Sequence, residues 1–182
     1  MVEESRPTKR LVIDASVLRA AGGINRPNET SSRCSRFLQA VLNICHRVVL
    51  TREIEQEWNR HVTAFSFSDQ WRVDMTSRRK FLRERKASDP TLRRRIQNAV
   101  QSGEDIHLIE AAERGDRIVV SLDMRARNRF QVAAEAVEAI RGIVWVNPSA
   151  TEGDPIAWLE EGCPTENVLT LGEETDRTDD RS

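Results

Sequence analysis

Short apolar segments alternate with longer segments of helical periodicity along most of this chain. Four short runs are rich in β-branched residues, at residues 10–14, 47–50, 117–121 and 143–146. Such runs are typical of strands buried in a parallel sheet. The spacing of the remaining apolar residues predicts helices over about 31–45, 51–64, 71–86, 90–100, 104–114 and 124–140. The order is strand, helix, strand, four helices, strand, helix, strand. It predicts an α/β fold with a mainly parallel four- to five-stranded sheet and helices on both faces.

The end of the chain departs from this pattern. After Pro148 the periodicity gives way to Gly, Pro, Thr and acidic residues, and only residues 156–159 resemble a docking element. Segments of low hydrophobicity and high charge are typically disordered, so we expect disorder beyond about Leu171. The sequence therefore predicts one domain over residues 1–148 and a partly disordered acidic C-terminal extension over residues 149–182.

The composition agrees with one α/β domain and argues against several protein classes. The 182 residues are enough for one buried core. The longest apolar runs are far shorter than the ~20 residues of a membrane-spanning helix, and residues 1–10 contain no apolar stretch of signal-peptide length. The three cysteines form no CxxC pair, so neither a disulfide framework nor a thiolate zinc site is expected. We therefore expect a cytoplasmic protein with no membrane partner.

Charge is strongly segregated along the chain, although the formal net charge is only −1. Residues 71–101 contain ten basic residues against three acidic ones, a net charge of +7. Residues 151–182 contain ten acidic residues against two basic ones, a net charge of −8. Basic segments can neutralise phosphates and release counterions, which is the sequence-independent part of nucleic-acid binding.

We interpret residues 71–101 as a basic helical insertion that binds nucleic acid. The alternative is an ordinary solvated helix surface, but balancing acids are scarce there. Trp71 and Phe81 are assigned to the core. The predicted nucleic-acid contacts are Arg78, Arg79, Lys80, Arg83, Arg93, Arg94 and Arg95.

Two acidic residues follow predicted strands. Asp14 ends the first apolar run, and Asp123 comes directly after Leu122 at the exit of the third. Ligand sites in open α/β sheets form beyond the carboxyl ends of the strands, and a carboxylate among apolar residues needs solvent, a donor or a metal. Glu57 and Asp105 would come from helices that begin at the same edge. Taken singly, each acid could be a cap, loop or surface residue; together they predict one acidic site.

Four segments of the chain resemble, in order, the motifs of the PIN-domain nucleases. They are residues 11–16 (LVIDAS), 51–58 (TREIEQEW), 103–112 (GEDIHLIEAA) and 118–123 (IVVSLD), and the resemblance covers roughly residues 9–147. It implies a three-layer PIN-like fold. It also implies that the metal-binding and catalytic acids are Asp14, Glu57, Asp105 and Asp123, with Ser16 and Ser121 as polar supports.

Two of these acids have competitors nearby in the sequence. Glu53 lies one helical turn before Glu57 on the same face, and Glu55 is also close. Glu57 is preferred because the resemblance places the glutamate a full turn inside its helix. Glu104 competes with Asp105, and a helical Asp105 is the better match to the resemblance.

The expected chemistry follows from the residue types. Carboxylates gathered in one pocket repel one another and raise their pKa values unless cations neutralise them. Hard oxygen ligands suit Mg²⁺ or Mn²⁺, whereas zinc favours His and Cys. A bound metal could activate water for phosphodiester hydrolysis without a covalent enzyme intermediate. His61, Arg125 and Asn128 are further candidates for contacts with the substrate or the metal.

Together, the acids, the basic segment and the resemblance predict a metal-dependent ribonuclease, with DNA as an alternative substrate. The resemblance implies the toxin of a bacterial toxin-antitoxin pair as the setting, with an antitoxin partner and a homodimer as further expectations; a processing or defence nuclease is the alternative. A non-catalytic nucleic-acid or protein-binding module is the second hypothesis. A phosphate-handling enzyme of another type is disfavoured, since no second Asp lies two residues after Asp14 and no GxxxxGK[ST] loop is present.

Overall fold

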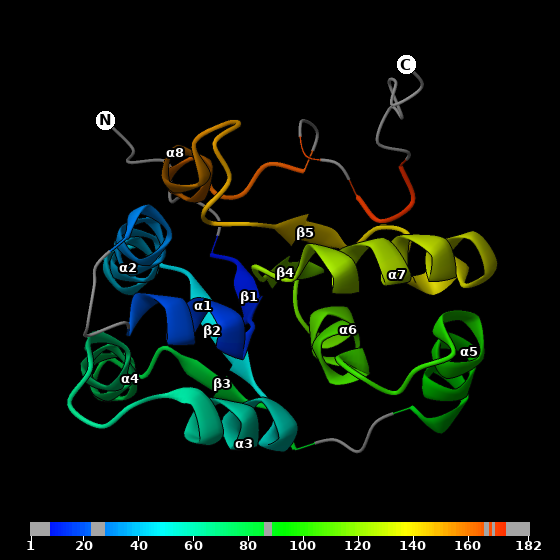
Figure 1. Cartoon of the computed structure of the whole chain (residues 1–182), viewed down its shortest axis with the longest axis horizontal. Helices are drawn as coiled ribbons and strands as arrows, with labels where there is room; N and C mark the ends of the chain where they lie inside the picture. Colours follow the sequence, from blue (N-terminus) through cyan, green and yellow to red (C-terminus); the bar gives the residue numbers. More distant parts are fainter. Residues whose placement is uncertain (1–7, 23–27, 86–88, 166–167, 169, 174–182) are drawn as a thin grey trace.

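The computed structural model describes residues 8–22, 28–85, 89–165, 168 and 170–173. Its centre is a sheet of five parallel strands in the order β3-β2-β1-β4-β5 (Figure 1). These strands are β1 (Arg10–Ile13), β2 (Arg47–Leu50), β3 (Phe81–Arg83), β4 (Ile118–Val120) and β5 (Val144–Val146). The side chains of β4 are buried in both directions, which explains a continuous β-branched run in place of alternation.

Helices cover both faces of the sheet, so the predicted three-layer α/β architecture is confirmed (Figure 1). One layer contains α1 (Ala15–Ala21), α2 (Glu29–Asn43), α3 (Arg52–His61) and α4 (Phe67–Ser77). The other contains α5 (Pro90–Val100), α6 (Ile106–Arg114) and α7 (Met124–Ala136), followed by the short 3₁₀ turn η1 (Glu138–Ile140). Helix α1 was not predicted, because its seven residues follow directly on β1 without a separate apolar period.

The strand order reverses at β1. The chain adds β2 and β3 on one side of β1, and then crosses the sheet to add β4 and β5 on the other side. The connections after β1 and β4 consequently lead to opposite layers and leave a crevice between them at the carboxyl ends of these strands. Asp14 follows β1, and Asp123 follows β4 after two residues, so the topology brings two strand-end acids to this crevice.

The prediction of one helix over residues 71–86 is wrong, whereas the basic helix predicted at residues 90–100 is present as α5. Helix α4 ends at Ser77, and Arg79 adopts a positive φ of 54°, which turns the chain back toward the sheet. Phe81 and Leu82 then pair in parallel with β2, so the segment supplies the edge strand β3. The apolar pair Phe81-Leu82 is too short to reveal a strand among its basic neighbours, and the charge pattern alone resembled a helix surface.

Aromatic side chains join α3 and α4 to the sheet. Trp58 is fully buried and lies 6.1 Å from Trp71 and 5.8 Å from Phe81, measured between ring centroids. Trp71 is a core residue, as predicted, and Phe81 is half-buried against the core. The Trp58 indole Nε1 donates to the carbonyl of Ile13 at 3.1 Å. This contact fixes the end of β1 immediately before Asp14.

Part of the C-terminal extension docks on the domain. Helix α8 (Pro155–Glu160) packs on α2, and Leu159, Cys163 and Leu171 are buried, in agreement with the docking element predicted at 156–159. His46 is fully buried beneath it; its Nε2 lies 2.8 Å from the carbonyl of Leu159. The predicted disorder concerns mainly residues 174–182, which lie outside the described residues. Within the described ranges, no helix combines the length and apolar character needed to cross a membrane.

Candidate functional site

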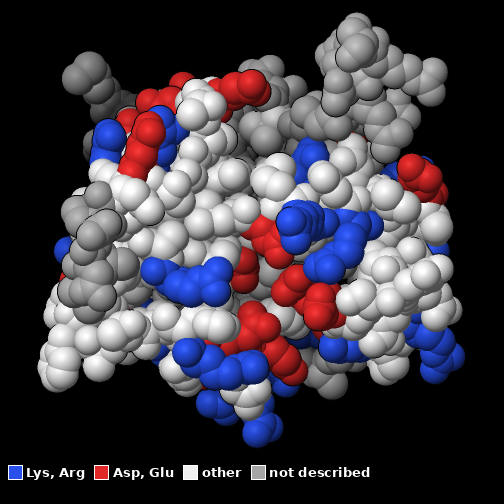
Figure 2. Space-filling model, viewed as in Figure 1, with Lys and Arg blue, Asp and Glu red and all other residues white. Residues whose placement is uncertain are grey.

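A hollow of about 480 Å³ opens at the carboxyl ends of β1 and β4, and all four predicted acids line it. In the orientation of Figure 1, Figure 2 shows acidic side chains gathered near the centre of this face, with basic side chains on their flanks. The two weaker candidates His61 and Arg125 also line the hollow, together with Arg19 from α1. Residues from the whole length of the domain therefore meet here.

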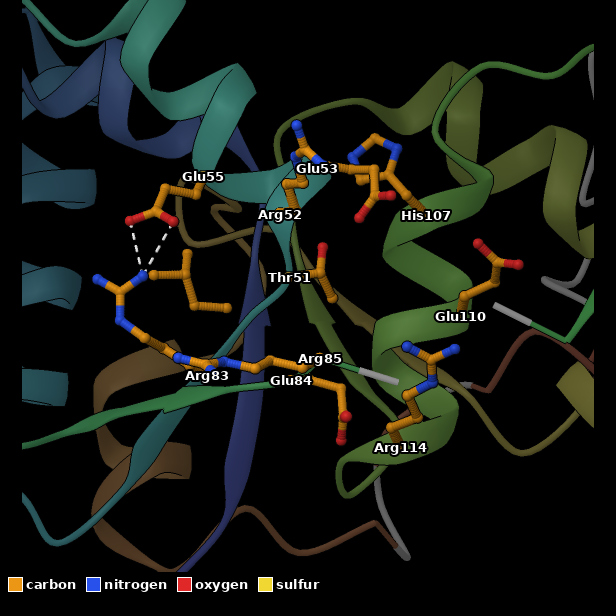
Figure 3. A pocket seen from close by; sticks show the side chains of 11 residues that line it. Thr51, Arg52, Glu53, Glu55, Arg83, Glu84, Arg85, His107, Glu110 and Arg114 are labelled. Atoms are coloured by element: carbon orange, nitrogen blue, oxygen red, sulfur yellow. Dashed lines mark hydrogen bonds and ion pairs between the residues drawn. The ribbon is translucent and has the colours of Figure 1, made fainter. Parts of the chain in front are cut away.

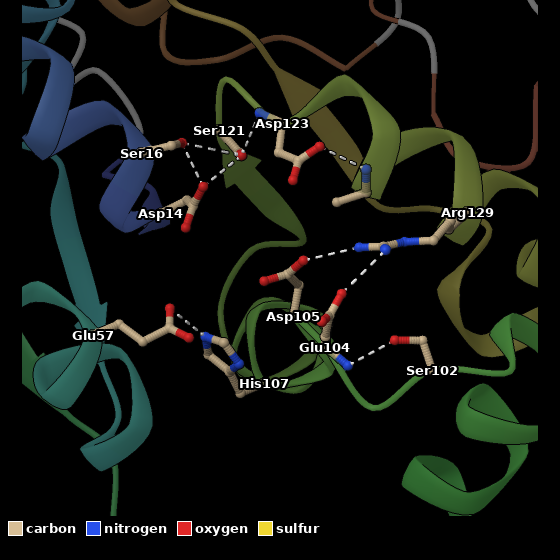
Figure 4. Close-up of polar contacts among 11 residues, drawn as sticks. Asp14, Ser16, Glu57, Ser102, Glu104, Asp105, His107, Ser121, Asp123 and Arg129 are labelled. Carbon is tan, nitrogen blue, oxygen red and sulfur yellow. Dashed lines mark hydrogen bonds and ion pairs between the residues drawn. The ribbon is translucent and has the colours of Figure 1, made fainter. Parts of the chain in front are cut away.

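Two serines hold the strand-end acids (Figure 4). Asp14 is only 8% exposed, and its Oδ2 accepts hydrogen bonds from Ser16 Oγ and, at 2.7 Å, from Ser121 Oγ. Each serine also accepts a backbone N–H: Leu122 donates to Ser16 at 3.1 Å, and Asp123 donates to Ser121 at 3.0 Å. Both predicted supports therefore contact the site, and they tie the chain after β1 to the chain after β4.

Asp123 is held by the start of α7. It is the N-cap residue of that helix, and its Oδ1 accepts the backbone N–H of Ala126 at 2.9 Å. A carboxylate at a helix N-terminus is stabilised by the unpaired N–H groups and the helix dipole. Since Asp123 is exposed, its other oxygen remains available at the surface of the hollow.

Asp105 precedes α6 and does not lie inside it, contrary to the prediction of a helical residue. It adopts a left-handed backbone with φ 59°, a conformation that Asp tolerates better than most residues. Its Oδ2 accepts Arg129 Nη2 at 3.1 Å, while Glu104 lies 3.4 Å from the same guanidinium. Burial raises the pKa of Asp105, as does the nearby negative charge of Asp14. This carboxylate therefore lies where negative charge is only partly compensated.

Glu57 faces the hollow, and the competing glutamates of α3 do not line it. Glu57 Oε2 lies 3.1 Å from His107 Nε2. Glu53 and Glu55 instead line a neighbouring hollow. By the same geometric criterion, Asp105 lines the acidic hollow and Glu104 does not.

The four carboxylates do not form a ready metal cage. In the described part of the chain, no three His, Cys, Asp or Glu side chains are arranged so that they could hold a metal ion together. Each acid instead bonds its own protein donor, as Figure 4 shows. The donor types nevertheless fit a hard divalent cation, because all four are carboxylates. Their side chains would have to turn toward one another to share an ion.

A second hollow, of about 460 Å³, lies at the carboxyl ends of β2 and β3 (Figure 3). Arg83 pairs with Glu55 across it, with 2.8 Å between Nη1 and Oε1. His107 lines this hollow and also contacts Glu57, so the Glu57–His107 pair lies between the two hollows. The basic residues that line it are Arg52, Arg83, Arg85 and Arg114.

The predicted basic surface is divided by the fold. Lys80 is buried, and its ammonium donates to the carbonyls of Val41, Leu42 and Ile44 near the end of α2. Burial lowers its pKa to about 8. The prediction that Lys80 contacts nucleic acid is therefore wrong, because its polar end is enclosed by carbonyl groups. Arg79 is exposed but precedes β3, so it lies near the amino ends of the strands, whereas the acidic hollow lies at their carboxyl ends.

The other predicted basic residues differ in their surroundings. Arg78 also precedes β3, and its Nη1 lies 3.3 Å from the carbonyl of Leu42. Arg93 pairs with the buried Glu110 at 2.7 Å and joins α5 to α6. Arg94 and Arg95 are exposed on α5. Of this set, Arg83 is the residue that lies at the carboxyl end of a strand, the same end of the sheet as the acids.

His107 and Arg129 contact the acids, yet the sequence carries no local signal for either. The Glu57–His107 contact joins residues 50 positions apart, and the Asp105–Arg129 contact joins residues 24 positions apart. Comparisons with models of known protein families and with curated proteins gave no match. A functional assignment must therefore rest on the site itself.

Proposed function

We propose that this chain is a metal-dependent nuclease of the PIN-like type that hydrolyses phosphodiester bonds in RNA. The observation that supports this most strongly is the convergence of Asp14, Glu57, Asp105 and Asp123 on one hollow. They come from four separate parts of the chain and meet where the strand order reverses, which is where open α/β folds bind ligands. The helix cap formed by Asp123 and the serine contacts of Asp14 do not explain why all four acids line one hollow.

In this proposal the four carboxylates would hold Mg²⁺ or Mn²⁺, which would supply an activated water and stabilisation of charge on the phosphate. The two serines fix Asp14, and the N-terminus of α7 fixes Asp123. Arg19 and Arg125 line the same hollow and would attract the phosphate backbone. The chain itself therefore contributes binding, orientation and charge.

The biological setting belongs to the same proposal. The PIN-like resemblance of the four segments suggests a cytoplasmic toxin with an antitoxin protein as partner, or a related processing or defence nuclease. DNA is an alternative substrate, since phosphate contacts alone do not separate it from RNA. A homodimer is one assembly to be tested by sedimentation.

A non-catalytic nucleic-acid-binding module is the second candidate. It is favoured by one observation: within the described residues, no three donors are arranged to hold a metal ion. The two candidates differ in what they require of the acids, because a binding module has no need for a cation at all four carboxylates.

The deciding experiment is cleavage of single-stranded RNA and DNA with Mg²⁺, Mn²⁺ or EDTA. We expect cleavage of RNA that EDTA abolishes, and losses of about a hundredfold or more in Asp14→Asn and Asp123→Asn. Glu57→Gln should be impaired in the same way, whereas the matched variant Glu53→Gln on the same helix should retain most activity. RNA binding without metal-dependent cleavage would favour the binding module. Activity retained by Asp14→Asn and Asp123→Asn would refute the site.

A further inference from the structure

Arg129 contacts the acidic site directly through an ion pair with Asp105. Its guanidinium comes from α7 and spans two acids, with Nη2 3.1 Å from Asp105 Oδ2 and Nη1 3.4 Å from Glu104 Oε2. Asp105 lies close enough to Asp14 and Asp123 to experience their negative charge. The guanidinium therefore supplies positive charge to a carboxylate that its acidic neighbours repel.

This contact also opposes the binding of a cation in the hollow. The guanidinium contacts Oδ2 of Asp105, and its positive charge, 3.1 Å from that oxygen, repels a cation that would share Asp105 with Asp14 and Asp123. The present arrangement, in which no three donors of the described residues can hold an ion together, includes this engagement of Asp105. Binding of a metal at Asp105 thus favours separation of the carboxylate and the guanidinium.

The surroundings of Arg129 make that separation feasible. Its side chain is 36% exposed, and the Glu104 side chain is 76% exposed, so water screens the contacts. Arg125 lies four residues earlier on α7, on the same helical face, and already lines the acidic hollow. Asp105, which Arg129 contacts, also lines this hollow, so the guanidinium lies beside it. The planar guanidinium can bind two oxygens of a phosphate at once.

We infer that Arg129 is a resident counter-ion of Asp105 that a divalent cation displaces, and that the released guanidinium then binds a phosphate of the substrate. This inference rests on the proposed function, because it assumes a cation site at the acids. It assigns Arg129 two successive partners. A residue that merely orients Asp105 would keep one partner and would strengthen metal binding.

The two roles predict opposite changes in metal affinity when the charge of Arg129 is removed. Titration of Mn²⁺ without nucleic acid, followed by calorimetry and by the electron paramagnetic resonance of free Mn²⁺, measures this affinity. A competing counter-ion predicts that Arg129→Gln binds Mn²⁺ about two- to fivefold more tightly than wild type, the range expected for losing a screened ion pair. Arg129→Lys retains the charge without the fork and should lie between the two.

The matched control is Arg125→Gln, which removes the same charge from the same helical face without touching the contact to Asp105. Its effect on Mn²⁺ affinity should be clearly smaller than that of Arg129→Gln. An equal effect, or an unchanged or weakened affinity in a folded Arg129→Gln, overturns the counter-ion role. If wild type shows no saturable Mn²⁺ binding that Asp14→Asn impairs, the metal site of the proposed function fails instead.

The second partner is tested with single-stranded RNA that carries 2′-O-methyl riboses and resists cleavage. With saturating Mn²⁺, Arg129→Gln should bind this RNA about three- to tenfold more weakly than wild type, as loss of one charge-assisted contact predicts. Without Mn²⁺ the two proteins should bind within about twofold of each other, since Arg129 is then engaged with Asp105. Equal weakening with and without Mn²⁺ would overturn the exchange of partners.

Discussion

Ser16 and Ser121 form a redundant pair whose energetic coupling the structure predicts. Both hydroxyls donate to the same oxygen of the buried Asp14 carboxylate, and each accepts one backbone N–H. Replacing either serine by alanine removes one bond to the carboxylate and leaves one N–H, of Leu122 or Asp123, without its acceptor. The other serine continues to solvate Asp14. We therefore expect each single variant to lower the free energy of unfolding by about 1–2 kcal/mol.

The double variant should cost more than the sum of the two single ones. Without both hydroxyls, Oδ2 of an acid that is only 8% exposed loses both side-chain donors. A buried charged group left without its hydrogen bonds costs about 1–3 kcal/mol beyond the bonds themselves. The predicted coupling energy between Ser16→Ala and Ser121→Ala is consequently about 1–2 kcal/mol.

Urea unfolding of wild type, the two single variants and the double variant at pH 7 measures this coupling. The same four proteins carrying Asp14→Asn provide the control, because removing the charge should reduce the coupling to below about 0.5 kcal/mol. Additivity within about 0.5 kcal/mol in the Asp14 background would refute the reasoning. It would mean that neither serine compensates for loss of the other as a hydrogen-bond donor to the Asp14 carboxylate.

Three further predictions concern residues around the site. Lys80→Met should lower the free energy of unfolding by about 2–3 kcal/mol, since three carbonyls lose their donor; RNA affinity by fluorescence anisotropy should stay within twofold, and a large loss would restore Lys80 to the binding surface. Arg93→Gln should lower the free energy of unfolding in urea by about 1.5–3 kcal/mol, because Glu110, which is 6% exposed, keeps a buried charge without its cation. The exposed control Arg94→Gln should change it by less than about 0.5 kcal/mol. Similar losses in both variants would contradict this prediction. Burial lowers the pKa of His46 in the folded protein below its usual 6.5, so at falling pH the unfolded chain takes up a proton at His46 before the folded protein does. The free energy of unfolding should therefore decline as the pH falls below 6.5. The same pH dependence in His46→Gln would exclude His46 as its origin.

The parts of the fold that could be predicted are those whose signals are local. Apart from the exposed Arg10, the residues of β1 and β4 are buried and apolar, and the acid that follows each run marks the strand end. Asp14 and Asp123 could therefore be placed at one edge of the sheet from sequence alone. The layered architecture followed from the alternation of strands and helices.

The edge strand β3 could not be predicted in the same way. It has three residues, and neither Phe81 nor Leu82 is fully buried, so the apolar signal is short and basic residues surround it. Its strand character comes from pairing with β2, a contact between distant parts of the chain. Without β3 in the predicted fold, the sequence could not show that Arg79 and Arg83 lie near opposite ends of one strand. One basic surface was therefore expected in place of several.

The same division between local and distant contacts runs through the acidic site itself. Asp123 is held by Ser121 and Ala126, which are two and three residues away. Asp14 is held by Ser16, two residues away, and by Ser121, which is 107 residues away. These bonds involve hydroxyl and backbone groups that carry no charge. Glu57 and Asp105 instead face the side chains of His107 and Arg129, which are distant in sequence. If the acids bind a cation as proposed, Asp14 and Asp123 have no charged partner among the described residues to lose, whereas at Asp105 the positive charge of Arg129 opposes the incoming cation.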